Sequence, residues 1–226
     1  MKLHKSIVAI FDKSNNTLIN NEWIINEHEN GAIFKTVKIR DIQAGSYSID
    51  SDLYRNRFEK VFENSTILND KDCDGCAIIH HNQNKYILLV ELKSGFDPTR
   101  ISKAYEQALT TLLKNHMLFS LCDGYDIKEY NICIMIVCLP PNEAKKVWLK
   151  DQYLLMQNSG VHAQQDCCFA ARLYMEQKID TKLRDVTFFT NCPFNTSIND
   201  LNIHITLKNP PTTSDTELDL SINTIL

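Results

Sequence analysis

Two short apolar runs separated by a polar break constrain the fold of this chain more than any other feature. The first run follows Asp74, the second contains Glu91 and Lys93, and the break is the sequence Asn-Gln-Asn-Lys at residues 82–85. Apolar runs of this length, bounded by turn-forming residues, are typical of strands, and a short polar break folds two such strands into a hairpin. A helix is expected next, over residues 101–119, where apolar side chains recur at helical spacing.

The predicted hairpin brings two acids and a lysine together. Glu91 and Lys93 are two residues apart, so on a strand both side chains point to the same face. Asp74 opens the first strand and would lie beside Glu91 when the hairpin closes. Hard cations such as Mg²⁺ bind one or two carboxylates together with water and phosphate oxygens, so Asp74 and Glu91 suit a metal that acts on a phosphodiester. Lys93 would orient the attacking water or stabilise charge on the phosphate.

At these residues the chain resembles the PD-(D/E)XK nuclease superfamily. That superfamily has an acid, a variable hairpin, and then the triplet acid-any-lysine on the next strand. Here Asp74 is followed by a sixteen-residue gap and then by the triplet Glu91-Leu92-Lys93. The chain departs from the pattern at Cys73, where the superfamily often has a proline before the first acid.

The resemblance implies roles for two further residues on predicted helices. Gln107, on the helix over residues 101–119, stands where many members have a glutamine near the metal. Glu59, on a helix expected over residues 52–63, is the candidate for a further acid. It lies opposite the apolar stripe of that helix, which favours a solvent-facing glutamate instead.

The resemblance also implies a fold and an activity. The expected fold is a restriction-endonuclease-like α/β sandwich with a mixed central sheet flanked by helices. The implied activity is cleavage of nucleic acid, DNA rather than RNA, by an endonuclease that uses Mg²⁺, for which Mn²⁺ would substitute. Phage defence or restriction is the expected setting. A homodimer, or a partner protein such as an ATPase or a sensor subunit, would complete the assembly.

Length and hydrophobic patterning agree with one domain. A chain of 226 residues that is 43% hydrophobic can bury a sizeable core. We expect a single nuclease-like domain over residues 1–226, with an N-terminal β elaboration at 1–49 and a C-terminal α/β elaboration at 141–226. The longest apolar run, at residues 132–139, is too short to span a membrane, and the run at residues 7–11 is too short for a secretory signal. A cytoplasmic protein is therefore expected.

The net charge of −4 requires any contact with nucleic acid to be local, because phosphate contacts need lysine or arginine. Lys38 and Arg40 fall on the polar face of an alternating pattern at residues 33–40, as in a half-buried strand. Lys103 and Lys114 fall on the polar side of the helix over residues 101–119. All four are candidate phosphate contacts, and an ordinary solvated surface remains the alternative.

Eight cysteines raise a second metal hypothesis. Cys73 and Cys76 form a C-x-x-C pair, but Cys167 and Cys168 are adjacent and do not provide the second spaced pair that a structural zinc site usually needs. We therefore expect reduced cysteines without a metal, and a zinc or redox site is the alternative.

The remaining patterns predict further elements along the chain. Strands are expected at residues 5–11, 32–39, 131–139, 185–190 and 201–207, with a further strand possible around Trp23. Helices are expected at 143–156 and 168–179, and the acidic tail is either a solvated extension or an edge strand at 218–225.

Two readings other than an enzyme stay open. A nuclease-fold chain without catalysis could serve as a binding or assembly subunit of a larger complex, and the acidic balance favours this reading slightly. The second alternative is a cysteine-based zinc protein. Asp74, Glu91 and Lys93 argue for chemistry, because a binding module has no evident need for two carboxylates that face one lysine.

Overall fold

The fold is known from a computed structural model, which describes residues 2–10, 16–27, 31–50, 72–159, 165–186 and 196–226. The predicted helix over residues 52–63, with Glu59, lies outside the described residues. None of the described helices is long and apolar enough to cross a membrane.

A seven-stranded mixed sheet forms the centre of the described part of the chain. Its first three neighbouring pairs are antiparallel, the next two pairs are parallel, and the last pair is antiparallel. In spatial order the strands are β1 (Asn16–Leu18), β4 (Tyr47–Ile49), β5 (Gly75–His81), β6 (Asn84–Lys93), β7 (Tyr130–Cys138), β9 (Asn202–Lys208) and β8 (Lys178–Lys182).

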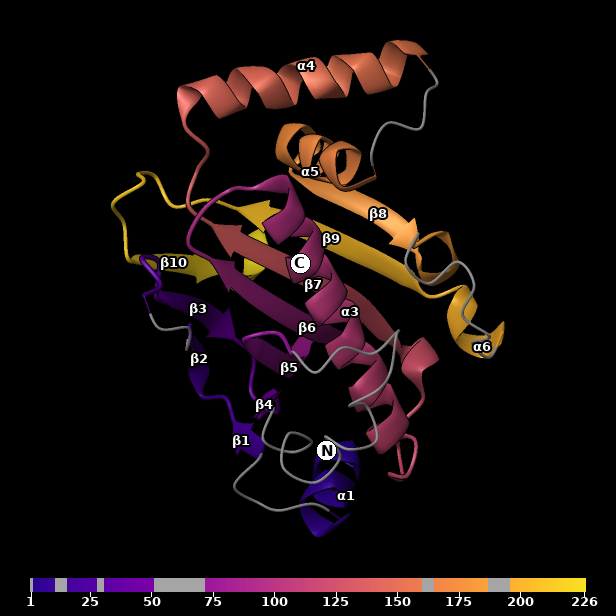
Figure 1. The fold of residues 1–226 in the computed structure, drawn as a ribbon. Helices are drawn as coiled ribbons and strands as arrows, with labels where there is room; N and C mark the ends of the chain where they lie inside the picture. Colours follow the sequence, from indigo (N-terminus) through magenta and orange to yellow (C-terminus); the bar gives the residue numbers. More distant parts are fainter. Residues whose placement is uncertain (1, 11–15, 28–30, 51–71, 160–164, 187–195) are drawn as a thin grey trace.

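Helices cover one face of this sheet, and a smaller sheet covers the other (Figure 1). The smaller sheet has the order β10 (Glu217–Ser221), β3 (Thr36–Ile42) and β2 (Asn21–Asn26). The helices are α1 (Lys2–Ile10), α3 (Pro98–Phe119), α4 (Glu143–Ser159), α5 (Gln165–Glu176) and the short α6 (Thr196–Asn199). Short 3₁₀ turns follow at Ile127–Glu129, Leu183–Asp185 and Ile222–Thr224. The mixed α/β class and the sheet flanked by helices are confirmed.

The β5–β6 hairpin forms as the sequence predicts. Asn82 and Gln83 connect the strands, and both have positive φ, at 47° and 67°. Two successive left-handed residues are what a tight two-residue hairpin turn requires, and asparagine tolerates that conformation well. The turn fixes the register between the strands, in which Gly75 pairs with Val90.

α3 connects β6 to its parallel neighbour β7 and packs on the sheet. Asp97 caps its first turn by accepting a hydrogen bond from the backbone N–H of Thr99 at 3.1 Å, and Pro98 occupies the first helical position. Proline is well tolerated there because its missing N–H would have no partner inside the helix.

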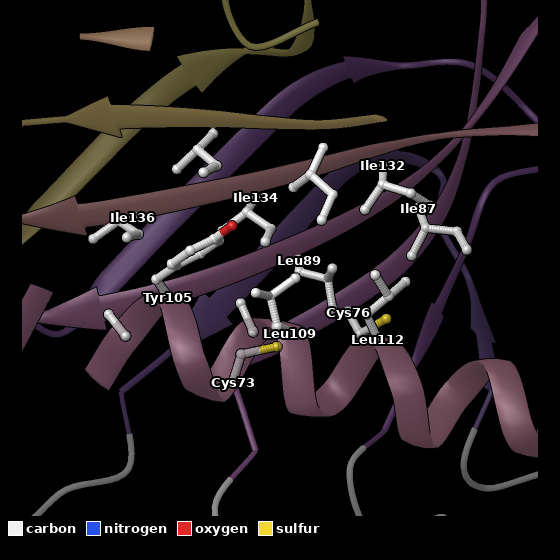
Figure 2. Close-up of a cluster of buried hydrophobic side chains, with 14 of the residues drawn as sticks. Cys73, Cys76, Ile87, Leu89, Tyr105, Leu109, Leu112, Ile132, Ile134 and Ile136 are labelled. Carbon is white, nitrogen blue, oxygen red and sulfur yellow. The ribbon is translucent and has the colours of Figure 1, made fainter. Parts of the chain in front are cut away.

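The core between α3 and the sheet is closely packed. Figure 2 shows Leu109 and Leu112 of α3 beside Leu89 of β6 and Ile134 of β7. All four are fully buried, and burial of each such side chain stabilises the fold by about 1.5–3 kcal/mol. The buried stripe predicted for this helix is confirmed: Ile101, Tyr105, Ala108, Leu112 and Phe119 are all at most 6% exposed.

Several predicted elements are confirmed with shifted ends. The strands expected at 131–139 and 201–207 are β7 and β9, and the helix expected at 143–156 is α4. A strand around Trp23 exists as β2, and the tail contains the edge strand β10. The strand expected at 32–39 is β3, which starts at Thr36 and leaves Ile33 55% exposed.

One expectation was wrong, one is confirmed with shifted ends, and one is tested only at its first two residues. Residues 5–11 were expected to form a strand, but residues 2–10 form α1, which buries Leu3 and Ile7 one turn apart. The helix expected at 168–179 ends at Glu176, because Gln177 adopts a left-handed conformation with φ of 62° and β8 follows. Asp185 belongs to a 3₁₀ turn instead of a strand, and residues 187–190 lie outside the described part of the chain.

The contact between the two sheets generates the first testable prediction. A Cβ atom added at Gly75 would lie 2.9 Å from the Trp23 ring and 3.1 Å from Ile25. Overpacking of this kind costs about 1–3 kcal/mol, so Gly75→Ala should lower the free energy of unfolding in urea by that amount. Gly95→Ala is the control, because a Cβ there meets nothing within 4 Å. Equal stability of the two variants would contradict the described packing.

Candidate metal centre at the β5–β6 hairpin

Asp74 and Glu91 lie side by side at the end of the hairpin away from its turn. Asp74 immediately precedes β5, and Glu91 is near the end of β6. The backbone N–H of Asp74 donates to Oε2 of Glu91 at 3.2 Å, and the N–H of Leu92 donates to Oδ2 of Asp74 at 2.7 Å. Each carboxylate is therefore held by the backbone of the strand that carries the other.

Lys93 completes the group. Its Nζ donates to Oε1 of Glu91, and the two side chains are 16% and 2% exposed. Strand alternation places both on the face of the sheet that carries Ile87 and Leu89, which is the face covered by α3. The structure thus brings together the two acids and the lysine selected from the sequence.

The electrostatics of this group follow from burial and from crowded negative charge. Burial, helped by the neighbouring Asp74 charge, raises the pKa of Glu91 to about 8, although Lys93 opposes the shift. Burial alone would lower the pKa of Lys93, but the charge and hydrogen bond of Glu91 outweigh it and raise that pKa above its usual value. Lys93 is therefore an ammonium at neutral pH, and a cation that binds the two acids would displace the proton that the raised pKa favours on Glu91.

The donor set fits a hard cation that keeps other ligands. Within the described residues, no three His, Cys, Asp or Glu side chains are grouped so that they could hold a metal ion. Asp74 and Glu91 would supply two carboxylates, and Mg²⁺ commonly binds through one or two carboxylates while it retains water and phosphate oxygens. Carboxylate oxygen is poorly suited to soft metals.

A third acid near the site was missed by the sequence reasoning. Glu27 follows β2, and its charge contributes to the raised pKa values of both Glu91 and Lys93. The backbone N–H of Ile33 donates to Oγ of Ser94 at 2.8 Å, which attaches the region between β2 and β3 to the residue after Lys93. No spacing rule reveals Glu27, because it comes from the other sheet.

Gln107 lies close to the segment that leads into the site. It is half-buried on α3, and its backbone carbonyl accepts a hydrogen bond from Oγ1 of Thr111 at 3.0 Å. Oγ1 of Thr111 in turn accepts a hydrogen bond from the backbone N–H of Cys73 at 3.0 Å. Gln107 thus lies one helical turn before Thr111, the residue that contacts Cys73 next to Asp74. A contact between the Gln107 side chain and the two acids stays a prediction.

Lys114 is placed differently from the expectation. It was assigned to a polar, nucleic-acid-facing side of α3, but it is only 3% exposed and donates to Oδ1 of Asp72 at 2.7 Å. Asp72 is itself 5% exposed. Lys114 therefore cannot contact a phosphate without unfolding this region, and the pair instead joins α3 to the segment that precedes β5.

The other candidate phosphate contacts lie apart from one another. Lys38 and Arg40 are on β3 in the smaller sheet, and Lys103 is exposed on α3 across the main sheet (Figure 1). Lys38 forms an ion pair with Glu217 at 3.0 Å, and Arg40 pairs with Asp219 at 2.6 Å. These acids reduce the positive potential that a phosphate would meet, so Lys103 is the better placed of the three.

The C-x-x-C pair belongs to the core. Cys73 and Cys76 are each 3% exposed, and Figure 2 shows both beneath α3 among apolar side chains. Burial raises the pKa of Cys76 to about 12 and that of Cys73 well above its usual value. Sγ of Cys73 donates to the backbone carbonyl of Gly75 at 3.2 Å, and Sγ of Cys76 accepts from Nδ2 of Asn115 at 3.2 Å, so both sulfurs have hydrogen-bond partners within the protein.

The buried pair of Asp72 and Lys114 generates the second prediction. Lys114→Met keeps the length of the side chain but leaves a buried carboxylate without its ammonium partner. Loss of one partner of a buried ion pair costs about 3–5 kcal/mol, so the free energy of unfolding in urea should fall by that amount. Lys103→Met, on the exposed side of the same helix, should change it by less than about 0.5 kcal/mol. A similar small change in both variants would show that Lys114 is not buried as described.

Comparisons with known proteins identified no relative of this chain. No protein-family model matches the chain, and neither the curated proteins nor the solved structures gave a match. The case for a function therefore depends on Asp74, Glu91 and Lys93 themselves.

Proposed function

We propose that this protein is a Mg²⁺-dependent endonuclease of the PD-(D/E)XK type, with its active site at Asp74, Glu91 and Lys93. The observation that carries the proposal is the reciprocal bonding of the two carboxylates, with Lys93 on Glu91. A buried group of two acids and one lysine is costly for folding, and a metal-dependent hydrolytic site explains its presence.

Asp74 and Glu91 are the residues that would hold the cation. A divalent metal in such a site acts as a Lewis acid and lowers the pKa of a bound water. The chain's own contribution is to fix the two carboxylates through the backbone N–H groups of Asp74 and Leu92. Because those bonds come from the paired strands, the acids need little rearrangement to bind.

Lys93 would act as a charge-stabilising donor. Its raised pKa keeps it protonated at neutral pH, so it is unsuited to the role of a general base. A fixed ammonium beside the acids can donate to a phosphate oxygen or orient the attacking water, and such preorganised donors are worth about 10²–10³ in rate.

The order of elements supports the restriction-endonuclease-like interpretation of the fold. β5 and β6 form the motif hairpin, and α3 then crosses to the parallel strand β7. In nucleases that the motif resembles, the metal site lies where the two motif strands diverge. Asp74 and Glu91 occupy that end of the hairpin here.

DNA is the proposed substrate, and antiviral defence or restriction in the cytoplasm is the proposed setting; both follow from the resemblance alone. A homodimer is part of the proposal because two cuts in a duplex usually need two active sites. A partner such as an ATPase or a sensor subunit would supply the specificity.

The activity prediction concerns Lys93. Single-turnover cleavage of plasmid, single-stranded DNA and RNA should be measured with Mg²⁺ and with Mn²⁺. Lys93→Ala should cut at least about 100-fold more slowly than the wild type, because it loses one preorganised donor. Lys93→Arg should rescue poorly, since a planar guanidinium does not replace a compact ammonium.

The matched control is Lys150→Ala, which removes an exposed lysine from α4 that is not among the candidate phosphate contacts. It should retain the cleavage rate of the wild type. Equal rates for the wild type and Lys93→Ala would remove Lys93 from the mechanism. Folded wild type that cuts no substrate with either metal would favour the binding or assembly subunit instead.

A further inference from the structure

A pocket lies at the opposite end of the hairpin from the two acids. Its volume is about 440 Å³, within the range of roughly 300–1,000 Å³ that is typical of small-molecule sites. Its walls come from the end of β5, the starts of β6 and β7, β4, α1 and the turn after α3. The lining includes Tyr47, His80, Lys85, Tyr125, Glu129 and Tyr130.

The pocket is distinct from the candidate metal centre. Lys85 and Glu91 both belong to β6 and are six residues apart. A strand rises about 3.3 Å per residue, so about 20 Å of strand separates the pocket from the acids. A ligand here would not touch Asp74, Glu91 or Lys93.

Three tyrosines contribute to the walls of the pocket. Tyr47, Tyr125 and Tyr130 reach it from three different parts of the chain, and the rings of Tyr125 and Tyr130 are 5.7 Å apart at a tilt of 35°. Tyr125 is fixed by a 3.1 Å hydrogen bond between its hydroxyl and Nδ1 of His116. Tyr47 and Tyr130 are only 2% and 7% exposed, so the half-buried Tyr125 offers the ring on which a planar π-system would stack.

The charged groups of the pocket balance one another. Lys2 and Lys85 are matched by Asp126 and Glu129, and Lys85 bonds Glu129 at 2.5 Å. Nζ of Lys85 also lies 5.6 Å from the centre of the Tyr130 ring. Such a lining offers donors and acceptors without a net field, which suits an uncharged polar ligand better than an anion.

His80 adds a neutral hydrogen-bonding group. Burial, followed by nearby positive charge that includes Lys85, lowers the pKa of His80, so its imidazole is neutral at pH 7 and can both donate and accept. The backbone N–H of His80 donates to Oγ of Ser46 at 3.0 Å, which holds this end of β5 against the segment that leads into β4.

We propose that this pocket binds a nucleobase, presented either by a free nucleoside or by one nucleotide of a single strand. A nucleobase is planar, uncharged at neutral pH and edged by donors and acceptors, and it stacks on tyrosine. The proposal is independent of nuclease activity, because it uses none of the residues of the metal centre.

The test is calorimetric titration of the full chain with the four nucleosides, their 5′-monophosphates and an eight-nucleotide single strand. At least one nucleoside or the single strand should bind saturably. Tyr125→Leu should weaken that binding at least about tenfold through loss of a stacking partner. His80→Ala, a second variant at a half-buried position, should weaken it as well. The control is Tyr86→Leu, which removes a tyrosine that packs on the other face of β6.

The separate titrations distinguish a free nucleoside from a base within a single strand, and each can also contradict the proposal. Saturation by a nucleoside identifies a free ligand, whereas saturation by the strand alone identifies a base within a polymer, and both support the proposal. Absence of binding by nucleosides and strand overturns it. A monophosphate that binds more than about tenfold tighter than its nucleoside overturns the assignment to an uncharged group. Equal loss in Tyr86→Leu and Tyr125→Leu also overturns it.

Discussion

The group around Glu91 is the constraint on which the interpretation of this protein depends. Glu91 is 1% exposed, and a buried carboxylate is unfavourable unless charges and hydrogen bonds compensate it. Lys93 and the backbone N–H of Asp74 provide that compensation, but apolar residues at such places are often equally or more stabilising. Stability alone therefore does not explain why a strand in the centre of the sheet ends in Glu-Leu-Lys.

The buried ion pair of Asp72 and Lys114 holds in place the segment that carries Asp74. Asp72 and Lys114 join the segment before β5 to α3, and Thr111 on the same helix accepts the backbone N–H of Cys73. Asp74 thus follows two consecutive residues that are fixed to α3. Because α3 also connects β6 to β7, the helix and both motif strands form one unit, and displacement of the helix would shift both acids.

The sequence predicts the centre of the fold better than its periphery. The β5–β6 hairpin, α3 and β7 have long, clear apolar patterns. The turn residues Asn82 and Gln83 also fix how β5 pairs with β6. α1 was misjudged because a short apolar run fits one helical turn as well as a strand. Lys114 was misjudged because its helical position is polar by pattern, and only the tertiary partner Asp72 makes its burial favourable.

The candidate site likewise contains residues that the sequence predicts and residues that it does not. Asp74, Glu91 and Lys93 are linked by strand period and hairpin register, which a sequence contains. Glu27 reaches the site from the smaller sheet, and the tyrosines of the pocket converge from β4, β7 and the turn after α3. Such long-range convergence depends on how sheets and helices stack, and no local pattern specifies it.

Direct binding of Mn²⁺ tests the central claim that Asp74 and Glu91 form a cation site. Calorimetric titration should show saturable binding by the wild type, and by the exposed control Glu143→Gln. Asp74→Asn and Glu91→Gln should each weaken it at least about tenfold, the scale on which even the supporting residues of metal sites act. Asp74→Asn should melt no lower than the wild type without added metal, since it removes one of two adjacent carboxylates and its amide oxygen can still accept the backbone N–H of Leu92. Undiminished Mn²⁺ affinity in Glu91→Gln would contradict the claim.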